Sequence, residues 1–336
     1  MKKLRVLVLM DPTMVPPASL EGYTEKEISG WKTEYHVVTT LRKLGHDVRP
    51  LGVHDELRPI REALDDGKPH IVFNLLEEFH GMVEFDYHVV SFLELMKARY
   101  TGCSPRGLVV ARDKALSKKI LHFHRIRVPK FAVFPRGRKI RPPLGFPYPA
   151  IVKSLTSEAS LGIAQASVVD TEAKLCDRVR FIHDKVETDA IAEQYIEGRE
   201  LYVSILCHQR PEVLPAWELL FENMPAGSMA IATDKVKHDP DYQEKRGIFQ
   251  QMADIPDALA GRIAATSRRI FKLLYLDGYA RIDYRLDKNG DLYFLEANPN
   301  PEIAPGEVFA EAADAVGYTY PALLQKILNL GLRRGR

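Results

Sequence analysis

The Asn-Gly pair at 289–290 constrains the fold most, because it lies between two segments of alternating polar and apolar residues. Asn-Gly is typical of two-residue hairpin loops, since a type I′ turn needs two residues that tolerate positive φ. Counting outward in antiparallel register places Asp283 opposite Glu296 and Arg281 opposite Asn298 on one face. The other face is predicted to be buried, and it carries the apolar residues Ile282, Tyr284, Leu286, Tyr293, Leu295 and Ala297.

The polar face of this hairpin predicts a metal site. Two carboxylates directly opposite each other repel, unless a cation lies between them. Asp283, Glu296 and Asn298 offer only oxygen ligands, which suits Mg²⁺ or Mn²⁺ better than zinc. Facing Cβ atoms about 5 Å apart could hold two such ions about 4 Å apart. The alternative is a solvent-facing hairpin with scattered charges, which does not account for the Asn-Pro-Asn-Pro sequence at 298–301.

Composition excludes several other classes of protein. The chain of 336 residues can hold two or three domains, and its formal net charge of +2 predicts no nucleic-acid partner. Cys103, Cys176 and Cys207 give neither a disulfide framework nor a zinc spacing, which is typical of a reducing cytoplasm. The apolar run at 4–10 is too short for a signal peptide, and no stretch approaches the ~20 apolar residues of a membrane span. We therefore expect a cytoplasmic protein without a membrane partner.

The first hundred residues alternate between strand and helix patterns, which indicates an open α/β domain. A capping box at Thr24–Glu27 is predicted to begin a helix that runs to Leu44. Strands are predicted at 4–10, 47–51 and 70–75, with a second helix at 56–65. Ligands in such sheets lie beyond the carboxyl ends of strands. The polar residues after the third strand are therefore substrate-side candidates, with a plain surface loop as the alternative: Asn74, Glu77, Glu78, His80 and Gly81.

A possible phosphate site follows the predicted strand at 148–153. Lys153 ends this strand, and the loop at 154–162 is rich in small residues whose N–H groups and hydroxyls can close over phosphates. An unpaired ammonium in a buried strand is costly, so a phosphate partner would explain it. The remaining elements are predicted as helices at 85–97, 113–121, 171–185, 256–276, 308–316 and 320–330, strands at 130–134, 190–196, 201–207 and 213–220, and a polar, mobile segment at 233–247.

Taken together, these motifs resemble the ATP-grasp superfamily, and within it the D-alanine–D-alanine ligases. The resemblance covers most of the chain from about Ile71 onward. It rests on the order and spacing of several short motifs: Tyr-Thr-Gly at 100–102, Asp-Lys at 113–114, Ile-Val-Lys at 151–153 with Gly162 nine residues later, Glu193 seven residues before Glu200, Arg-Ile-Asp at 281–283, and Leu-Glu-Ala-Asn at 295–298.

The resemblance implies a fold class of α/β and α+β, the ATP-grasp fold. Its parts would be an N-terminal open α/β (preATP-grasp) domain at 1–102, a central lobe at 103–190 and a C-terminal lobe at 191–336, with ATP between the two lobes. The implied function is an ATP-dependent carboxylate–amine ligase that forms an amide or peptide bond through an acyl phosphate. Its partners would be small carboxylate and amine substrates, and by analogy it would be a homodimer. The alternative is a catalytically silent nucleotide-binding module, although such a decayed site should have lost one of Lys153, Arg281, Asp283 or Glu296.

Individual roles also follow from the resemblance. Phosphate contacts would come from Lys114 and Lys153, with Ser160 and Gly162 in the covering loop. Glu193 would meet the adenine amino group, Gln194 and Ile196 would supply main-chain contacts, and Glu200 would hold the ribose. The catalytic and metal-binding set would be Lys235 at the γ-phosphate, Arg281 at the transferring phosphoryl group, and Asp283, Glu296 and Asn298 around two Mg²⁺ or Mn²⁺ ions.

Two regions depart from the ligases. Their glycine-rich turn with a Ser-x-Glu-Arg-Glu-like motif is here the proline-rich segment 11–21, and their Ser-Pro-Gly-Met-Thr segment is here 300–307. Prolines stiffen both turns and remove backbone donors. Glu302 and Glu307 add negative charge that would repel a second free carboxylate. We therefore expect that D-alanine is not preferred on both sides of the bond, with Asn300 and Glu302 joining Glu77 and His80 as candidate substrate contacts.

Overall fold

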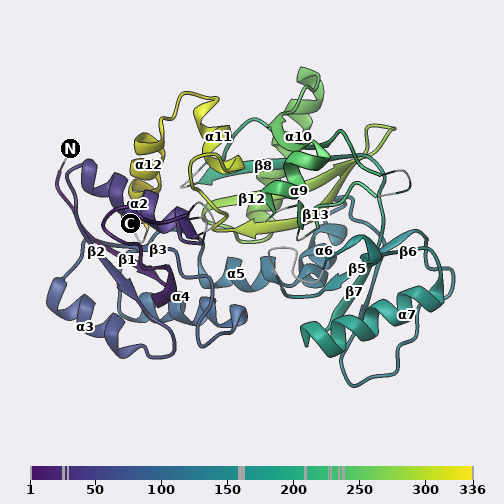
Figure 1. The fold of residues 1–336 in the computed structure, drawn as a ribbon, viewed down its shortest axis with the longest axis horizontal. Coiled ribbons are helices and arrows are strands. Elements are labelled where there is room, and N and C mark those ends of the chain that lie inside the picture. Colours follow the sequence, from purple (N-terminus) through teal and green to yellow (C-terminus); the bar gives the residue numbers. More distant parts are fainter. Residues whose placement is uncertain are drawn as a thin grey trace.

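The computed structural model describes residues 2–24, 27–28, 30–157, 163–207, 210–225, 227, 229–233, 235–236 and 239–334. Three sheets organise these residues (Figure 1). A three-stranded sheet lies at one end of the molecule, a four-stranded sheet lies at the other, and a larger antiparallel sheet lies above and between them. No helix in these ranges has the length and apolar character needed to cross a bilayer.

The N-terminal sheet is parallel, as predicted for an open α/β domain. Its order is β2-β1-β3, with β1 at Arg5–Met10, β2 at Asp47–Gly52 and β3 at Ile71–Asn74. The crossing helices are α2 (Lys32–Lys43), α3 (Arg58–Gly67) and α4 (Asp86–Leu95). The prediction of one continuous helix from Thr24 to Leu44 was wrong. Thr24 and Glu27 exchange capping hydrogen bonds and residues 27–28 are helical, but a turn at 30–31 precedes α2, which begins at Lys32.

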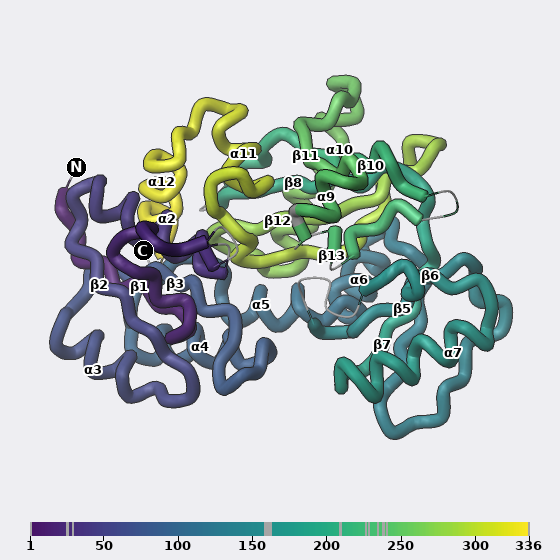
Figure 2. The backbone as a smooth tube through the Cα atoms, viewed as in Figure 1, coloured from purple at the N-terminus to yellow at the C-terminus, as the bar shows by residue number. Residues whose placement is uncertain are grey.

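The end of the chain returns to this first sheet. Helices α11 (Val308–Asp314) and α12 (Tyr320–Leu332) share one apolar core with β1, β3 and α2. Figure 2 shows α12 beside α2, with the C-terminus close by. The N-terminal sheet is therefore stabilised by residues more than two hundred positions away in sequence.

The four-stranded sheet has its own core. Its order is β4-β7-β5-β6, with β4 at Phe131–Phe134, β5 at Ala150–Ser154, β6 at Val168–Val169 and β7 at Ala190–Gln194. Helix α7 (Glu172–Phe181) and a π-helical turn at Ile182–Val186 cover this sheet. All its pairings are antiparallel, so this lobe differs in kind from the parallel N-terminal sheet.

The large sheet has the order β11-β10-β8-β12-β13, with β9 paired to β8. Its strands are β8 (Arg199–Cys207), β9 (Glu212–Val213), β10 (Trp217–Phe221), β11 (Ile248–Met252), β12 (Gly278–Leu286) and β13 (Leu292–Pro299). One core joins β8, β12 and β13 to the helices α5 (Pro105–Arg112), α6 (Lys114–Phe123) and α10 (Asp257–Leu273). Helix α5 and strand β11 were not predicted from the sequence.

The hairpin of β12 and β13 keeps the predicted register where it matters for the site. Asp283 pairs with Glu296, and Arg281 pairs with Asn298. The predicted two-residue turn was wrong, because pairing stops at Leu286 and leaves a five-residue loop at 287–291. A β-bulge in β13 compensates for the longer loop and so restores the predicted pairing of Asp283 with Glu296.

The bulge changes which residues face the core. Tyr284 pairs with Phe294 instead of Leu295, so Leu295 is the extra residue of β13. Phe294 is fully buried in the core beside Tyr284. Leu295 was predicted to occupy that apolar face, and the structure places it in the lining of the cavity described next.

Candidate functional site

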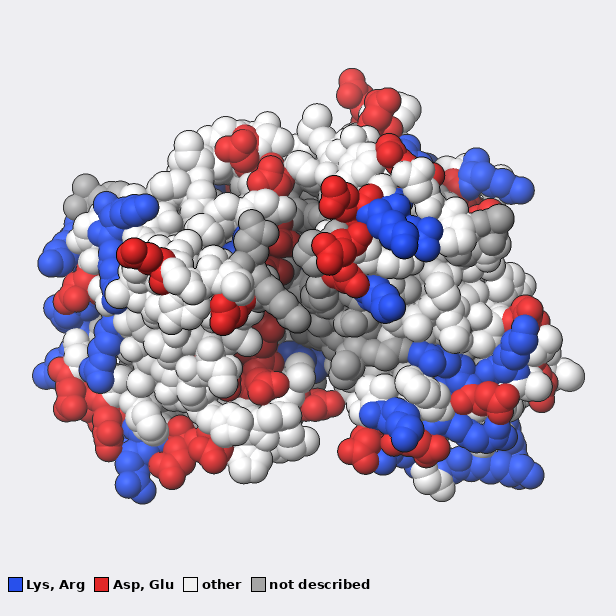
Figure 3. Space-filling model, in the orientation of Figure 1, with Lys and Arg blue, Asp and Glu red and all other residues white. Residues whose placement is uncertain are grey.

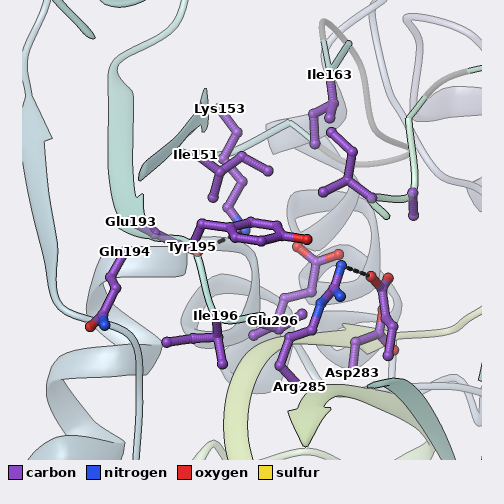
Figure 4. A pocket seen from close by; sticks show the side chains of 14 residues that line it. Ile151, Lys153, Ile163, Glu193, Gln194, Tyr195, Ile196, Asp283, Arg285 and Glu296 are labelled. Carbon is purple, nitrogen blue, oxygen red and sulfur yellow. Dashed lines mark hydrogen bonds and ion pairs between the residues drawn. The ribbon is translucent and has the colours of Figure 1, made fainter. Parts of the chain in front are cut away.

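A cavity lies between the four-stranded sheet and the large sheet (Figure 4). Its apolar wall comes mainly from isoleucines and Leu295, and the ring of Tyr195 reaches across it. Many residues predicted from distant motifs meet here. The cavity is lined by Ile151, Lys153, Ile163, Glu193, Gln194, Tyr195, Ile196, Glu200, Ile231, Ala232, Asp283, Arg285, Leu295 and Glu296.

Glu193 lies at the centre of a buried charge cluster. Its carboxylate is 2.7 Å from the Lys118 ammonium and 3.1 Å from the Lys153 ammonium. Burial alone would raise the pKa of Glu193, but attraction to Lys118 and Lys153 outweighs it and holds this pKa below its ordinary value. Lys153 therefore has a carboxylate partner within the protein. Its burial is therefore explained without a phosphate, and the role of Lys153 as a phosphate contact stays a prediction.

Lys118 was not among the predicted site residues. It is completely buried on α6, and its ammonium also donates to the carbonyl oxygen of Leu295. Burial lowers the pKa of Lys118 to about 8, although Glu193 acts in the opposite direction. The sequence offered one signal that could have identified Lys118: it lies four residues after Lys114, which places both lysines on one helix face. The Lys114 ammonium donates to the Ser157 carbonyl oxygen at 2.7 Å.

Arg281 supplies the compensating charge on the predicted metal face. Its guanidinium donates to both carboxylate oxygens of Asp283, at 2.8 Å and 2.9 Å. The Asn298 amide also donates to Asp283, at 2.9 Å. Burial alone would lower the pKa of Arg281, yet Asp283 outweighs it and the net effect raises this pKa. Lys114 lies 3.9 Å from Glu296. Cationic side chains therefore accompany both facing carboxylates, and the metal site stays a prediction.

The donor chemistry of this face nevertheless fits Mg²⁺. Asp283, Glu296 and Asn298 present only hard oxygen ligands, and Mg²⁺ commonly takes one or two carboxylates together with phosphate oxygens and water. Over the part of the chain that the structure describes, no group of three or more His, Cys, Asp or Glu side chains is placed to hold a metal ion. The face therefore fits an ion that a nucleotide helps to bind better than a site built wholly from protein.

A second charge network holds the predicted ribose-binding residue. Glu200 accepts hydrogen bonds from the Arg285 guanidinium at 2.7 Å and from the Tyr202 hydroxyl at 2.8 Å. Arg285 also donates to the Gly198 carbonyl oxygen at 2.8 Å. Arg285 was not predicted from the sequence, although its spacing of two from Asp283 places both side chains on one face of β12.

Four predicted nucleotide contacts are not among the described residues that line the cavity. Ser160 and Gly162 lie outside the described residues. Lys114 is described but does not line the cavity. Lys235 is exposed and does not line the cavity. Val236, in the segment predicted to be polar and mobile, is buried and packs in a cluster with β8 and β10. Helix α9 (Pro240–Arg246) follows within the same segment.

Two predicted substrate contacts, Glu77 and His80, follow β3. Both are exposed, and neither lines the cavity. The His80 ring stacks on His54, with 6.5 Å between ring centroids.

Figure 3 shows the face of the molecule that is seen in Figure 1. This face is hollowed in the middle, with Asp and Glu side chains around the hollow, while Lys and Arg gather over the four-stranded lobe.

The loop after β13 carries the other two predicted substrate contacts. Asn300 accepts a hydrogen bond from the Cys103 backbone N–H at 2.7 Å, so its side chain fastens this loop to the start of α5. Glu302 accepts from the Thr33 hydroxyl at 3.3 Å. The Glu307 carboxylate lies 3.4 Å from the Lys32 ammonium, which offsets the negative charge that was expected to repel a substrate carboxylate.

Many proteins are similar to this chain in sequence. The family described as "D-ala D-ala ligase C-terminus" matches residues 126–329. The D-alanine–D-alanine ligase of Syntrophotalea carbinolica is 30% identical over 90% of this chain and 91% of its own. The uncharacterized protein y4sG of Sinorhizobium fredii is 32% identical over 79% of this chain and 75% of its own.

Solved structures share the fold along nearly the whole chain. The D-alanine–D-alanine ligase of Bacillus anthracis, solved in complex with ATP, superimposes with a TM-score of 0.75 at 21% identity, covering 98% of each chain. The VanG D-Ala:D-Ser ligase of Enterococcus faecalis superimposes with a TM-score of 0.71 at 17% identity, covering 98% of this chain and all of its own. At these identities the structural likeness establishes the ATP-grasp fold.

Proposed function

This chain belongs to the D-alanine–D-alanine ligase family of ATP-grasp ligases, and from that premise we propose that it uses ATP and Mg²⁺ to join a small carboxylate to a small amine. The carboxylate would be phosphorylated by ATP, and the amine would then displace phosphate to form an amide bond. The observation that carries this proposal is the meeting of Lys153, Glu193, Glu200, Asp283 and Glu296 around one cavity between two sheets.

We assign the adenine, ribose and phosphate groups of ATP to different residues along the cavity. Its apolar wall suits the flat face of adenine, with main-chain contacts from Gln194 and Ile196. Glu200, held by Arg285 and Tyr202, offers carboxylate oxygens to the ribose hydroxyls. The Lys118–Glu193–Lys153 cluster carries a net positive charge of one, which favours phosphate nearby. Glu193 would then have two roles: it would hold Lys118 and Lys153 in place, and it would contact the adenine amino group.

The opposite end of the cavity supports phosphoryl transfer. Asp283, Glu296 and Asn298 would hold Mg²⁺, two ions in our proposal, and the bound metal would supply charge stabilisation at the transferring phosphoryl group. Arg281 would leave Asp283 to donate to developing negative charge, since its planar guanidinium suits phosphate oxygens. Lys235 would approach the γ-phosphate when its segment closes over the cavity.

The identity of the two substrates forms a finer part of the proposal. We infer that D-alanine does not occupy both substrate positions, because prolines stiffen the segments 11–21 and 300–307. The charge argument from Glu302 and Glu307 contributes less, since Lys32 and Thr33 engage these carboxylates. A homodimer is also proposed from the family resemblance, and sedimentation equilibrium would check it.

An ADP-release screen tests the function. The purified chain would be incubated with Mg²⁺-ATP and amino acids, singly and in pairs, with products identified by mass. We expect ADP release that requires both a carboxylate and an amine. Efficient D-alanyl-D-alanine formation from D-alanine alone would overturn the substrate inference but leave the ligase proposal standing. Nucleotide binding without turnover across a broad screen would favour a silent binding module.

A further inference from the structure

The bulge in β13 has a direct effect on the cavity. Consecutive residues of a regular strand point to opposite faces, yet Leu295 and Glu296 both line the cavity. This is possible because the bulge sets two residues of β13 against Asp283 alone. Leu295 can therefore contribute to the apolar wall while its neighbour Glu296 stays opposite Asp283.

Strand β13 lies at the edge of the sheet, so its outward backbone groups need partners from other elements. The Phe294 N–H donates to the Arg127 carbonyl oxygen at 2.9 Å. The Leu295 carbonyl oxygen accepts from the Lys118 ammonium, which also lies 5.6 Å from the centre of the Phe294 ring. The bulge is thus held from outside the sheet, and its charged partner is a completely buried lysine.

Lys118 also connects the two sides of the cavity. Its ammonium lies 2.7 Å from Glu193 on β7, in the four-stranded sheet, while it donates to Leu295 on β13, in the large sheet. A single buried cation therefore fixes the distance between the wall that carries Glu193 and the strand that carries Glu296. Burying an ammonium is costly, and three described partners offset that cost.

We propose that Lys118 is a positioning residue for nucleotide and metal binding, because it holds the bulge that turns both Leu295 and Glu296 into the cavity. This inference rests on the proposed function of the cavity. Lys118 itself need not touch either ligand. Its effect passes through the backbone of Leu295 to the carboxylate of Glu296. In metal sites of other proteins, groups that hold the metal ligands tune metal affinity in the same way.

The test compares Lys118→Met with Lys119→Met, which removes an exposed lysine from the next position of α6. In Lys118→Met, Glu193 keeps Lys153 as a partner. We expect the Mg²⁺ concentration for half-maximal binding of a non-hydrolysable ATP analogue to rise roughly 10- to 100-fold in Lys118→Met. Amide hydrogen exchange without nucleotide should accelerate over 292–299 and stay unchanged over the four-stranded sheet. Lys119→Met should match the wild type in both measurements.

Several outcomes separate positioning from general stabilisation. A folded Lys118→Met protein with the wild-type Mg²⁺ requirement would overturn the proposal, even if its melting temperature fell. If Lys118→Met does not fold, Lys118→Gln keeps a donor but loses the charge, and at least a threefold rise in the Mg²⁺ requirement is expected; no rise would refute the proposal. Absence of analogue binding by the wild type would instead refute the proposed function, and exchange over 292–299 would still decide whether Lys118 holds the bulge.

Discussion

At Asp283, the charge that balances a buried carboxylate comes from Arg281 on the same strand. The two side chains are only 5% and 19% exposed, so their bidentate contact is shielded from water. Binding of Mg²⁺ at Asp283 would then compete with Arg281, and metal binding would release the guanidinium toward the transferring phosphoryl group. The same pair thus links metal binding to catalysis in the proposed mechanism.

Asp283→Asn tests this view of the pair. We expect it to lower the free energy of unfolding of the ligand-free protein by about 1–3 kcal/mol, because the Arg281 guanidinium loses its charged partner. Turnover should fall by about a thousandfold as stabilisation of the transferring charge is lost. Urea unfolding and ADP release measure the two effects. Asp177→Asn, at an exposed position of α7, should stay within about 0.5 kcal/mol of the wild type; increased stability of Asp283→Asn would contradict the pairing.

Glu34 on α2 predicts a pH dependence of stability. Burial, and to a lesser degree the nearby charge of Glu302, raise the pKa of Glu34 to about 7 from an ordinary 4.5. Stability is therefore lost as pH rises from about 4.5 to about 7, because the unfolded chain ionises at Glu34 while the folded protein keeps it protonated. The cost is absent below about 4.5 and complete above about 7. Glu34→Gln should be more stable than the wild type at pH 8 by about 1–3 kcal/mol, with little difference at pH 5.

Urea unfolding at pH 5 and pH 8 would measure this effect, with Glu302→Gln as the matched control. Glu302 is exposed and is a smaller cause of the raised pKa, so its substitution should give a smaller gain at pH 8. An equal stability difference for Glu34→Gln at both pH values would show that folding does not raise the pKa of Glu34, so that the folded protein already carries it ionised at pH 5.

At the scale of elements, the segment 233–247 combines anchored and exposed positions. Val236 is buried against β8 and β10, while Lys235 next to it is exposed. A short segment anchored in this way can move its exposed lysine by a local rearrangement, without losing its contact with the sheet. This arrangement suits a lid that closes over the cavity.

Lys235→Met tests the role of this lid. We expect turnover to fall by at least about a hundredfold while affinity for an ATP analogue changes only a few-fold, because contact with the γ-phosphate strengthens on closure. Lys245→Met on α9 removes a lysine of the same segment and should have little effect. Hydrogen exchange over 233–247 should slow when an analogue and substrate are added. Complete protection before their addition would contradict closure.

The hairpin shows why part of the site could be predicted from sequence. Counting outward from Asn289-Gly290 placed Asp283 opposite Glu296. This pairing is confirmed although the loop is longer than predicted, because the bulge at Leu295 compensates for it. The bulge at Leu295 could not be read from the same pattern, and the partner that contacts its carbonyl oxygen, Lys118, is distant in sequence. Lys118 has no strand or loop signal of its own. The partners of Glu193 lie on helix α6 and on the neighbouring strand β5, and the sequence pattern does not indicate that these elements meet.

At the scale of the whole molecule, the two ends of the chain fold as one unit. Leucines and an isoleucine of α12 are completely or almost completely buried against β1, β3 and α2. We propose that the boundaries at residues 102 and 190 separate regions of different topology, but that these regions do not all fold independently. The four-stranded lobe has a core of its own, whereas α5 and α6 share theirs with the large sheet.

Removal of α12 tests this coupling. A chain that ends at residue 316 loses four side chains that are at most 1% exposed: Leu323, Leu324, Ile327 and Leu328. Each contributes about 1.5–3 kcal/mol by burial, so together they approach the whole stability of about 5–15 kcal/mol that is typical of a domain. We expect the shortened chain to aggregate or to lack cooperative thermal unfolding by circular dichroism. A chain that ends at Leu332 loses Arg334, which lies 2.9 Å from a partly exposed Asp277, and should be destabilised only modestly. A wild-type melting temperature for the 316-residue chain would show that the N-terminal sheet folds without its C-terminal cover.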